Sequence, residues 1–125
     1  MAEQNIGGKA TKVLYHAPKN GFFFTLDRSN GKLIDAKPFV DNINWATGYD
    51  LATGRPIENP EARFYKTGQP FVAIPGALGA HSWHPMSYNP ATGLVYIPAQ
   101  QVPQSYLNDM NELDRRKVLG FNVGS

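Results

Sequence analysis

The side chains of this sequence that could do chemistry gather in two short segments. Lys19 stands between a proline and an Asn-Gly pair, where by itself it indicates the solvated lysine of a turn. Ser82 and Trp83 lie between two histidines, His81 and His84. The sequence contains no cysteine, which excludes disulfide bonds, thiolate metal sites and a cysteine nucleophile. These five side chains are therefore the candidates for binding or catalysis.

The two histidines suggest a metal site, but their surroundings argue against one. Residues three apart can share one face of a helix, yet a glycine and an alanine precede the pair and a proline follows it. In an extended segment, residues three apart lie on opposite faces. No carboxylate lies within ten residues on either side to complete a ligand set. The sequence therefore predicts no metal site in this chain.

Composition places the chain among single-domain globular proteins that are rich in turns. Its 125 residues suit one domain, and 42% hydrophobic residues supply a core. The 12 glycines and 10 prolines favour short strands joined by turns. A net charge of +2 is too small to indicate binding to nucleic acid or to a membrane surface. No apolar run is long enough to span a bilayer, and the first residues do not read as a signal peptide.

One short element occurs three times along the chain. Each copy has an Asp or Asn after an apolar residue and a Gly four residues later, at the pairs Asp27 and Gly31, Asp50 and Gly54, Asn89 and Gly93. The Asp or Asn side chain can accept a hydrogen bond from a backbone N–H two residues on, while Gly takes a positive φ that a Cβ would penalise. The pattern predicts three tight β-hairpins.

Strands are expected on both sides of these turns. Residues 22–26 alternate between two faces, with Phe22, Phe24 and Leu26 on one and Phe23 and Thr25 on the other. The other strands are expected at residues 12–16, 32–36, 44–49, 71–74, 83–88 and 94–97, and the main loops at residues 56–68 and 75–80. The predicted fold class is mainly all-β, an antiparallel β meander that forms about two propeller-type blades.

The end of the chain has a different character. Ser105 can cap a helix over residues 105–119, in which Leu107, Met110 and Leu113 share an apolar face. Gly120 stands where a helix C-terminus favours it. The expected organisation is therefore a partial propeller segment at residues 1–103, followed by a divergent, helical tail at residues 104–125.

Three stretches closely resemble the quinoprotein alcohol dehydrogenases, which use pyrroloquinoline quinone (PQQ). They are KVLYHAPKNGFFFTLDRSNGK at residues 12–32, NWATGYD at residues 44–50 and GAHSWHPMSYNPATGLVYIPA at residues 79–99. The match runs from about residue 3 to residue 103 and fades over residues 104–125. The resemblance implies an eight-bladed propeller, of which this chain is an internal slice of about a fifth.

The resemblance also implies an activity, which is the oxidation of primary or secondary alcohols in the periplasm with transfer of electrons to a cytochrome. In the family, Ca²⁺ sits beside PQQ, an Asp acts as the base, and hydride moves to the quinone C5 carbon. The family's calcium ligands and catalytic Asp lie upstream of the matched region. This chain alone is therefore expected to show no dehydrogenase turnover, since most of the catalytic machinery is missing.

Three residues match cofactor-contact positions of the family. Lys19 matches the basic residue that hydrogen-bonds the quinone oxygens, where a fixed ammonium stabilises developing negative charge. Trp83 matches a tryptophan whose indole N–H meets PQQ, although a core aromatic between two blades explains it equally well. Ser82 stands where the family often has Asn, and a hydroxyl with one donor cannot reproduce the whole amide contact. The resemblance thus implies that Lys19 is a catalytic and PQQ-binding residue, and that Ser82 and Trp83 bind PQQ.

The sequence leaves a second function open and predicts an assembly. The alternative to the dehydrogenase segment is a non-enzymatic β-repeat module for interaction or scaffolding. In either case, about two blades leave unpaired strand edges and half-covered aromatic faces. Self-association of the chain is therefore expected.

Overall fold

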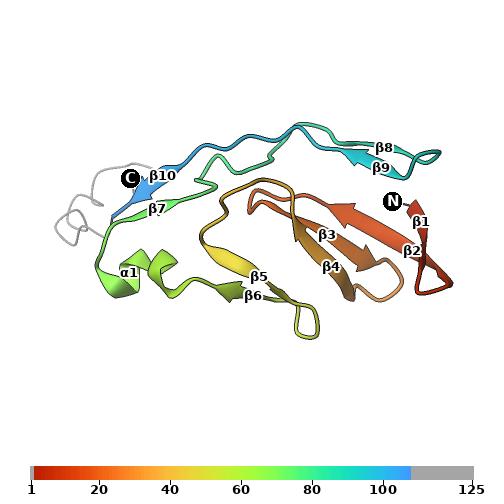
Figure 1. Ribbon diagram of the computed structural model, residues 1–125, viewed down its shortest axis with the longest axis horizontal. Coiled ribbons are helices and arrows are strands. Elements are labelled where there is room, and N and C mark those ends of the chain that lie inside the picture. The colour runs from red at the N-terminus through yellow and green to blue at the C-terminus, as the bar shows by residue number, and fades with distance from the viewer. Residues whose placement is uncertain (1, 108–125) are drawn as a thin grey trace, which may run out of the picture.

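The computed structural model describes residues 2–107 and begins with a four-stranded antiparallel sheet (Figure 1). Its strands are β1 (Ala2–Ile6), β2 (Lys9–His16), β3 (Phe22–Asp27) and β4 (Leu33–Pro38), and they pair in chain order. Gly7 and Gly8, with φ of 58° and 85°, form the two-residue turn between β1 and β2. Each strand thus pairs with the one that follows it, as in a propeller blade.

Three two-stranded antiparallel sheets follow. Strand β5 (Ala46–Asp50) pairs with β6 (Arg55–Glu58), β8 (Ser87–Asn89) with β9 (Leu94–Tyr96), and β7 (Phe71–Ala73) with β10 (Gln104–Tyr106). Two short helical elements, η1 (Pro60–Ala62) and α1 (Phe64–Thr67), connect β6 to β7. The prediction of a mainly antiparallel β fold is confirmed. In the part of the chain that is described, no helix is both long and apolar enough to cross a membrane.

The three predicted hairpin turns share one geometry. In each, the glycine N–H donates to the carbonyl oxygen of the Asp or Asn four residues earlier, at 2.8 Å. The side-chain oxygen of that Asp or Asn accepts from the N–H two residues on, at 2.8 or 2.9 Å. The glycine φ values are 75°, 70° and 71° for Gly31, Gly54 and Gly93. The turn prediction is therefore confirmed down to its hydrogen bonds.

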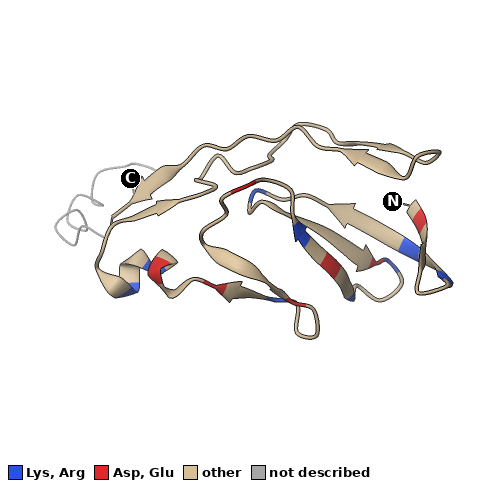
Figure 2. Cartoon of the chain, viewed as in Figure 1, with Lys and Arg blue, Asp and Glu red and all other residues tan. Residues whose placement is uncertain are grey.

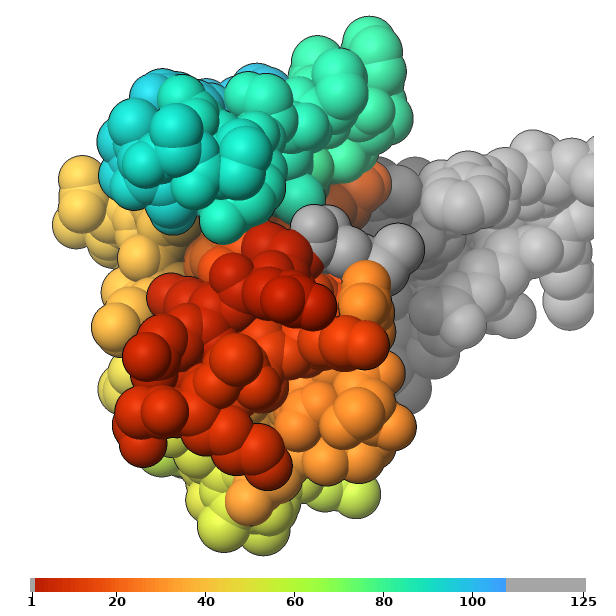
Figure 3. Space-filling model, turned by 90° about the vertical axis from the view of Figure 1, so that its right-hand side faces the viewer, coloured from red at the N-terminus to blue at the C-terminus, as the bar shows by residue number. Residues whose placement is uncertain are grey.

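Aromatic side chains hold the sheets in three layers. On one face of the first sheet, Phe24 meets Tyr49 of β5 with ring centroids 4.9 Å apart. On the other face, Tyr15 contacts Phe23 at 5.4 Å and Tyr88 of β8 at 5.8 Å. The predicted alternation along β3 therefore decides which hairpin packs on which face. Figures 1 and 3 show the β8–β9 hairpin on one side of the first sheet, with β5 and β6 on the other.

Charged side chains are confined to one part of the described chain. Residues 67–108 contain no Lys, Arg, Asp or Glu. Strands β7–β10 accordingly show neither charge colour in Figure 2, whereas β1–β6 and the helical segment carry both. The layers thus differ in chemistry as well as in position.

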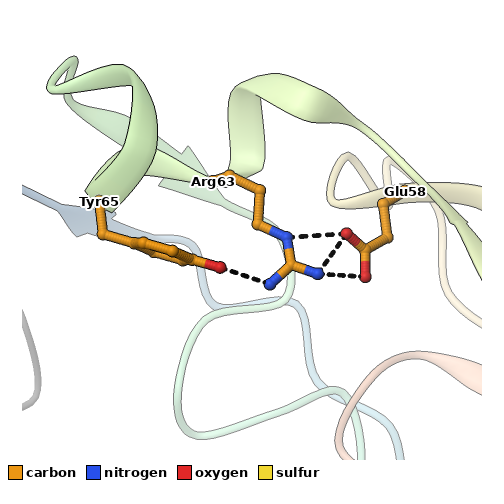
Figure 4. Close-up of polar contacts among 3 residues, drawn as sticks. All are labelled: Glu58, Arg63 and Tyr65. Carbon is orange, nitrogen blue, oxygen red and sulfur yellow. Dashed lines mark hydrogen bonds and ion pairs between the residues drawn. The ribbon is translucent and has the colours of Figure 1, made fainter.

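An ion pair fixes the helical segment to β6 (Figure 4). The Arg63 guanidinium donates to both carboxylate oxygens of Glu58, through Nε at 2.7 Å and through Nη2. Its Nη1 atom donates to the Tyr65 hydroxyl at 2.6 Å. The hydrogen bonds to Glu58 are the main cause that raises the pKa of Arg63 above its ordinary value. The pair is exposed to solvent, so its role is to orient η1 and α1 more than to stabilise the fold.

The structure departs from the predicted elements in four places. Strands β1 and β6 were not predicted, and β6 overlaps the start of the expected loop at residues 56–68. Residues 83–86 are not a strand, consistent with Pro85, which has no N–H for a ladder. Ser105 does not cap a helix, because it lies in β10 opposite Val72. Residues 108–119 of the predicted helix lie outside the described residues.

Two turn carboxylates predict how stability depends on pH. The hydrogen bonds from Ser29 lower the pKa of Asp27, and those led by the Thr53 hydroxyl lower that of Asp50. A lowered carboxyl pKa stabilises the folded state above the unfolded value of about 3.9, and this contribution is lost as the pH falls through the folded value. We expect the thermal midpoint to fall in acid, and to fall less in the Asp27→Asn/Asp50→Asn double variant. Asn89 makes the same turn hydrogen bond with an uncharged side chain, so the double variant should keep its turns. An identical fall of the thermal midpoint in acid for wild type and the double variant would contradict the prediction.

Candidate functional site

The turn between β2 and β3 lies against the segment that follows β7. Contacts between the two segments join residues 58 to 64 positions apart in the sequence. The N–H of Ala80 donates to the carbonyl oxygen of Lys19 at 2.8 Å. The Nδ1 atom of His81 lies 2.5 Å from the carbonyl oxygen of Ala17. The fold thus brings Lys19 next to the segment that carries Ser82 and Trp83.

The Lys19 side chain is exposed on a backbone that is held from both sides. Its Nζ atom donates to the carbonyl oxygen of Ala77 at 3.3 Å. On the opposite side of the turn, the Asn20 amide donates to the Tyr49 hydroxyl at 3.0 Å, and the Trp45 indole N–H donates to the Asn20 carbonyl oxygen at 3.0 Å. The main chain at Lys19 is therefore fixed, while its ammonium can meet a ligand from solvent.

Gly79 allows the two segments to touch, although its sequence context predicted only a loop residue. A Cβ at this position would lie 2.5 Å from Cβ and Cγ of Lys19 and 2.8 Å from its Cα. Gly79 also has a φ of 82°, which L side chains rarely adopt. Only glycine meets both requirements. The available signal was the glycine spacing in residues 76–79, within the predicted loop.

Ser82 and Trp83 differ in their exposure. Ser82 is half-buried, whereas 83% of Trp83 is exposed. The Trp83 indole stacks on the His84 ring with centroids 4.1 Å apart and planes 23° apart. Trp83 is therefore not a core aromatic of the described chain. The exposed Trp83 ring and the exposed Lys19 side chain are both open to a ligand from solvent.

His81 joins the two segments through Nδ1, while its Nε2 atom is occupied within its own segment. It is 7% exposed, and its Nε2 atom lies 2.8 Å from the carbonyl oxygen of His84, while Nδ1 faces Ala17. These contacts occupy the positions that a metal ion would need. Among residues 2–107, no group of three His, Cys, Asp or Glu side chains is placed to hold a metal ion. His81 is accordingly a structural residue of this site.

The charge of Lys19 is not neutralised by a described carboxylate. The salt bridges within residues 2–107 are Lys37 with Asp35, at 3.1 Å, and Arg63 with Glu58. The segment that faces Lys19 contains no acidic residue, since it lies within residues 67–108. An ammonium has three N–H donors, and a neutral carbonyl engages one of them here. The site therefore presents a full positive charge.

Three hollows between the layers of the described chain are not lined by the residues of this site. One is lined by Tyr49 and the turn of the β5–β6 hairpin, one by Asn59 and residues 40–44, and one by Tyr15 and the β9 strand. None of the three is lined by Lys19, Ser82 or Trp83.

Comparisons with known proteins identify relatives of much greater length. No protein-family model matches the chain. It is 53% identical over 124 residues to the quinohemoprotein alcohol dehydrogenase ADH IIB of Pseudomonas putida, covering 99% of this chain and 18% of the relative. It is 57% identical over 109 residues to a quinohemoprotein alcohol dehydrogenase of Comamonas testosteroni, covering 87% of this chain and 15% of the relative. The chain therefore spans about a sixth of the length of these relatives.

Solved structures give the same relationship. The quinohemoprotein alcohol dehydrogenase ADHIIG from Pseudomonas putida HK5 matches with a TM-score of 0.83 at 49% identity, covering 87% of this chain and 16% of that one. A europium-containing methanol dehydrogenase matches with a TM-score of 0.71 at 36% identity, covering 78% and 17%. The ADH IIB match takes in 99% of the chain and so extends into residues 104–125, whose divergence from the family stays a prediction.

Three alanine substitutions measure the close approach at Gly79. Gly48→Ala has open space and an ordinary φ, so it should change the free energy of unfolding little. Gly54→Ala has open space but a φ of 70°, and should cost about 1–2 kcal/mol. Gly79→Ala combines the same strain with the clash against Lys19, and should cost a further ~1–3 kcal/mol. Equal losses for Gly54→Ala and Gly79→Ala in urea unfolding would contradict the close packing.

Proposed function

We propose that this chain, which is related in sequence and fold to a segment of the quinoprotein alcohol dehydrogenases, forms part of the floor of a PQQ-binding site. The observation that carries the proposal is Lys19, an exposed ammonium with no described carboxylate partner, on a rigid turn. It stands in residues 12–32, one of the three stretches that closely resemble the family. Relatives named quinohemoprotein alcohol dehydrogenases share about half of the chain's residues.

The described residues fit PQQ but do not fit a metal ion. PQQ is a flat, anionic quinone, and Lys19 offers it a positive charge with N–H donors free to turn toward oxygen atoms. Trp83 offers an indole that is largely exposed, and Ser82 a hydroxyl. By contrast, no metal-ligand group exists within residues 2–107. We therefore propose that the calcium of the family is bound by residues that this chain does not contribute.

The activity that we propose for the whole protein is alcohol oxidation linked to a cytochrome, in the periplasm. One relative is named 1-butanol dehydrogenase (cytochrome c), from Thauera butanivorans, and is 50% identical over 111 residues, covering 89% of this chain and 16% of the relative. PQQ, when bound, supplies the quinone that accepts the hydride. The contribution of this chain is electrostatic, since the Lys19 ammonium stabilises negative charge that develops on a quinone oxygen.

The test is PQQ binding by isothermal titration calorimetry. We expect wild type to bind, Lys19→Met to bind about ten- to a hundredfold more weakly because a charge-assisted hydrogen bond is lost, and Lys19→Arg to retain most affinity. Lys32→Met is the matched control, since Lys32 is also an exposed lysine of a hairpin but lies in another turn. Equal affinity of wild type and Lys19→Met would refute the role of Lys19. No binding by wild type would favour the non-enzymatic β-repeat module.

We further propose that the chain self-associates through the charge-free part of its surface. Large exposed apolar side chains gather there, and about half the surface of Tyr96 on β9 and of Val72 on β7 is open to solvent. The others in this part are Leu78, Trp83, Leu94, Val102 and Leu107. An apolar surface without charges lacks the features that keep strand edges apart, so a second copy can cover it.

Light scattering on the chain in solution tests this association. We expect a mass of at least twice 13.8 kDa, because covering these side chains favours a dimer or larger assembly. Tyr96→Lys and Val72→Lys should shift the mass toward the monomer. Ile57→Lys is a matched control with similar exposure, 54% against 55% and 53%, but outside the charge-free part. A compact monomer of the wild-type chain would contradict the proposal.

A further inference from the structure

We infer that Gln100 and Gln104 are positioning residues that fix the loop at residues 76–80 and thereby direct the Lys19 ammonium. The importance of this direction for PQQ rests on the function proposed above. Neither glutamine contacts Lys19 in the described structure. Both act through Ala77 and Gly79, the loop residues that meet the Lys19 side chain.

Gln104 holds the residue that receives the Lys19 hydrogen bond. Its side-chain Oε1 atom accepts from the Ala77 N–H at 2.9 Å, and the carbonyl of that same Ala77 accepts from Lys19 Nζ. Gln104 is itself fixed, because it starts β10 and pairs with Ala73 of β7. Strand β10 therefore fixes the position of the loop at Ala77.

The start of the loop is also too tightly packed to shift. A Cβ at Gly76 would lie 2.5 Å from Cβ of Gln104 and 3.0 Å from its backbone nitrogen. The Gly76 N–H donates to the carbonyl oxygen of Val102 at 2.9 Å. The hydrogen bond between the Ala77 N–H and the Gln104 side chain therefore lies one residue after this close contact at Gly76, on the side toward Lys19.

Gln100 holds the other end of the loop. Its Nε2 atom donates to the carbonyl oxygens of Gly79, at 3.1 Å, and of Leu78, at 3.4 Å. Its backbone N–H donates to the carbonyl oxygen of Ala80 at 2.8 Å, and Ala80 in turn donates to Lys19. Gln100 therefore determines where Gly79 stands, and Gly79 touches the Lys19 side chain.

The two glutamines act through different atoms of the side-chain amide, which are the oxygen in Gln104 and the nitrogen in Gln100. Gln104 works through its oxygen, so glutamate preserves the acceptor while methionine removes it. Gln100 works through its nitrogen, so glutamate replaces the donor with an acceptor that faces two carbonyl oxygens. The same Gln→Glu change is therefore expected to be tolerated at position 104 and not at position 100. If the two glutamines only made the surface polar, the Gln→Glu change would have the same effect at both positions.

Lys19 reactivity in the chain without PQQ is the direct readout. The rate of acetylation of Lys19 by an N-hydroxysuccinimide ester is measured by mass spectrometry, relative to Lys32 of the same molecule. We expect Gln104→Met and Gln100→Glu to change this ratio by about two- to tenfold, the effect of one lost hydrogen bond. Gln104→Glu should keep the wild-type ratio, as should Gln101→Glu, whose wild-type side chain binds the Asp41 carbonyl instead of the loop.

PQQ affinity from calorimetry is the second readout on the same variants. We expect Gln104→Met and Gln100→Glu to weaken binding about two- to tenfold, with Gln104→Glu near wild type. Thermal melts show which variants are folded, and either of the two disruptive variants is sufficient for the test. Unchanged Lys19 reactivity in a folded disruptive variant would overturn the inference. Altered reactivity without PQQ binding by wild type would leave the positioning intact and refute the proposed function.

Discussion

The close contact between residues 17–21 and residues 76–81 is the constraint on which the site depends. Two backbone segments meet there with a hydrogen bond from Ala80 to Lys19, and the absence of a Cβ at Gly79 makes the distance possible. His81 closes the contact from a buried position. Because Asn20 is held by aromatic residues on the other side, the turn that carries Lys19 cannot move away from the loop. The exposed ammonium therefore stands on one of the best-fixed parts of the backbone.

The same turn lies within a three-layer stack of small sheets. Side chains on alternate faces of β3 contact β5 on one side and, through Tyr15, β8 on the other. Few side chains are fully buried, and many large apolar ones stay exposed, most of them in the layer without charges. This is the distribution expected of a blade-like unit that needs neighbours to cover its faces. It agrees with a chain that spans about a sixth of the length of its relatives.

Local chemistry predicted the hairpins well and the other elements less well. The Asp or Asn and Gly of each turn are four residues apart, so the hydrogen bonds that define the turn involve no distant partner. Strand β1 was missed because its residues are mostly polar, although Gly7 and Gly8 carried a hairpin signal. Strand β10 was missed because its residues also suit a helix start, and pairing with β7 overrides that preference. The edge position of β6 explains how a strand tolerates Pro56.

The sequence by itself determined the turns, the two faces of β3 and the family resemblance that directs attention to Lys19, because each of these depends on neighbouring residues or on a long continuous match. Only the tertiary structure decided what surrounds Lys19. Ala77, Gly79 and the two glutamines come from parts of the chain more than fifty residues away, and no local pattern encodes which loop will close on which turn. The exposure of Trp83 was decided in the same way, since burial depends on the whole packing of the chain and not on residue type.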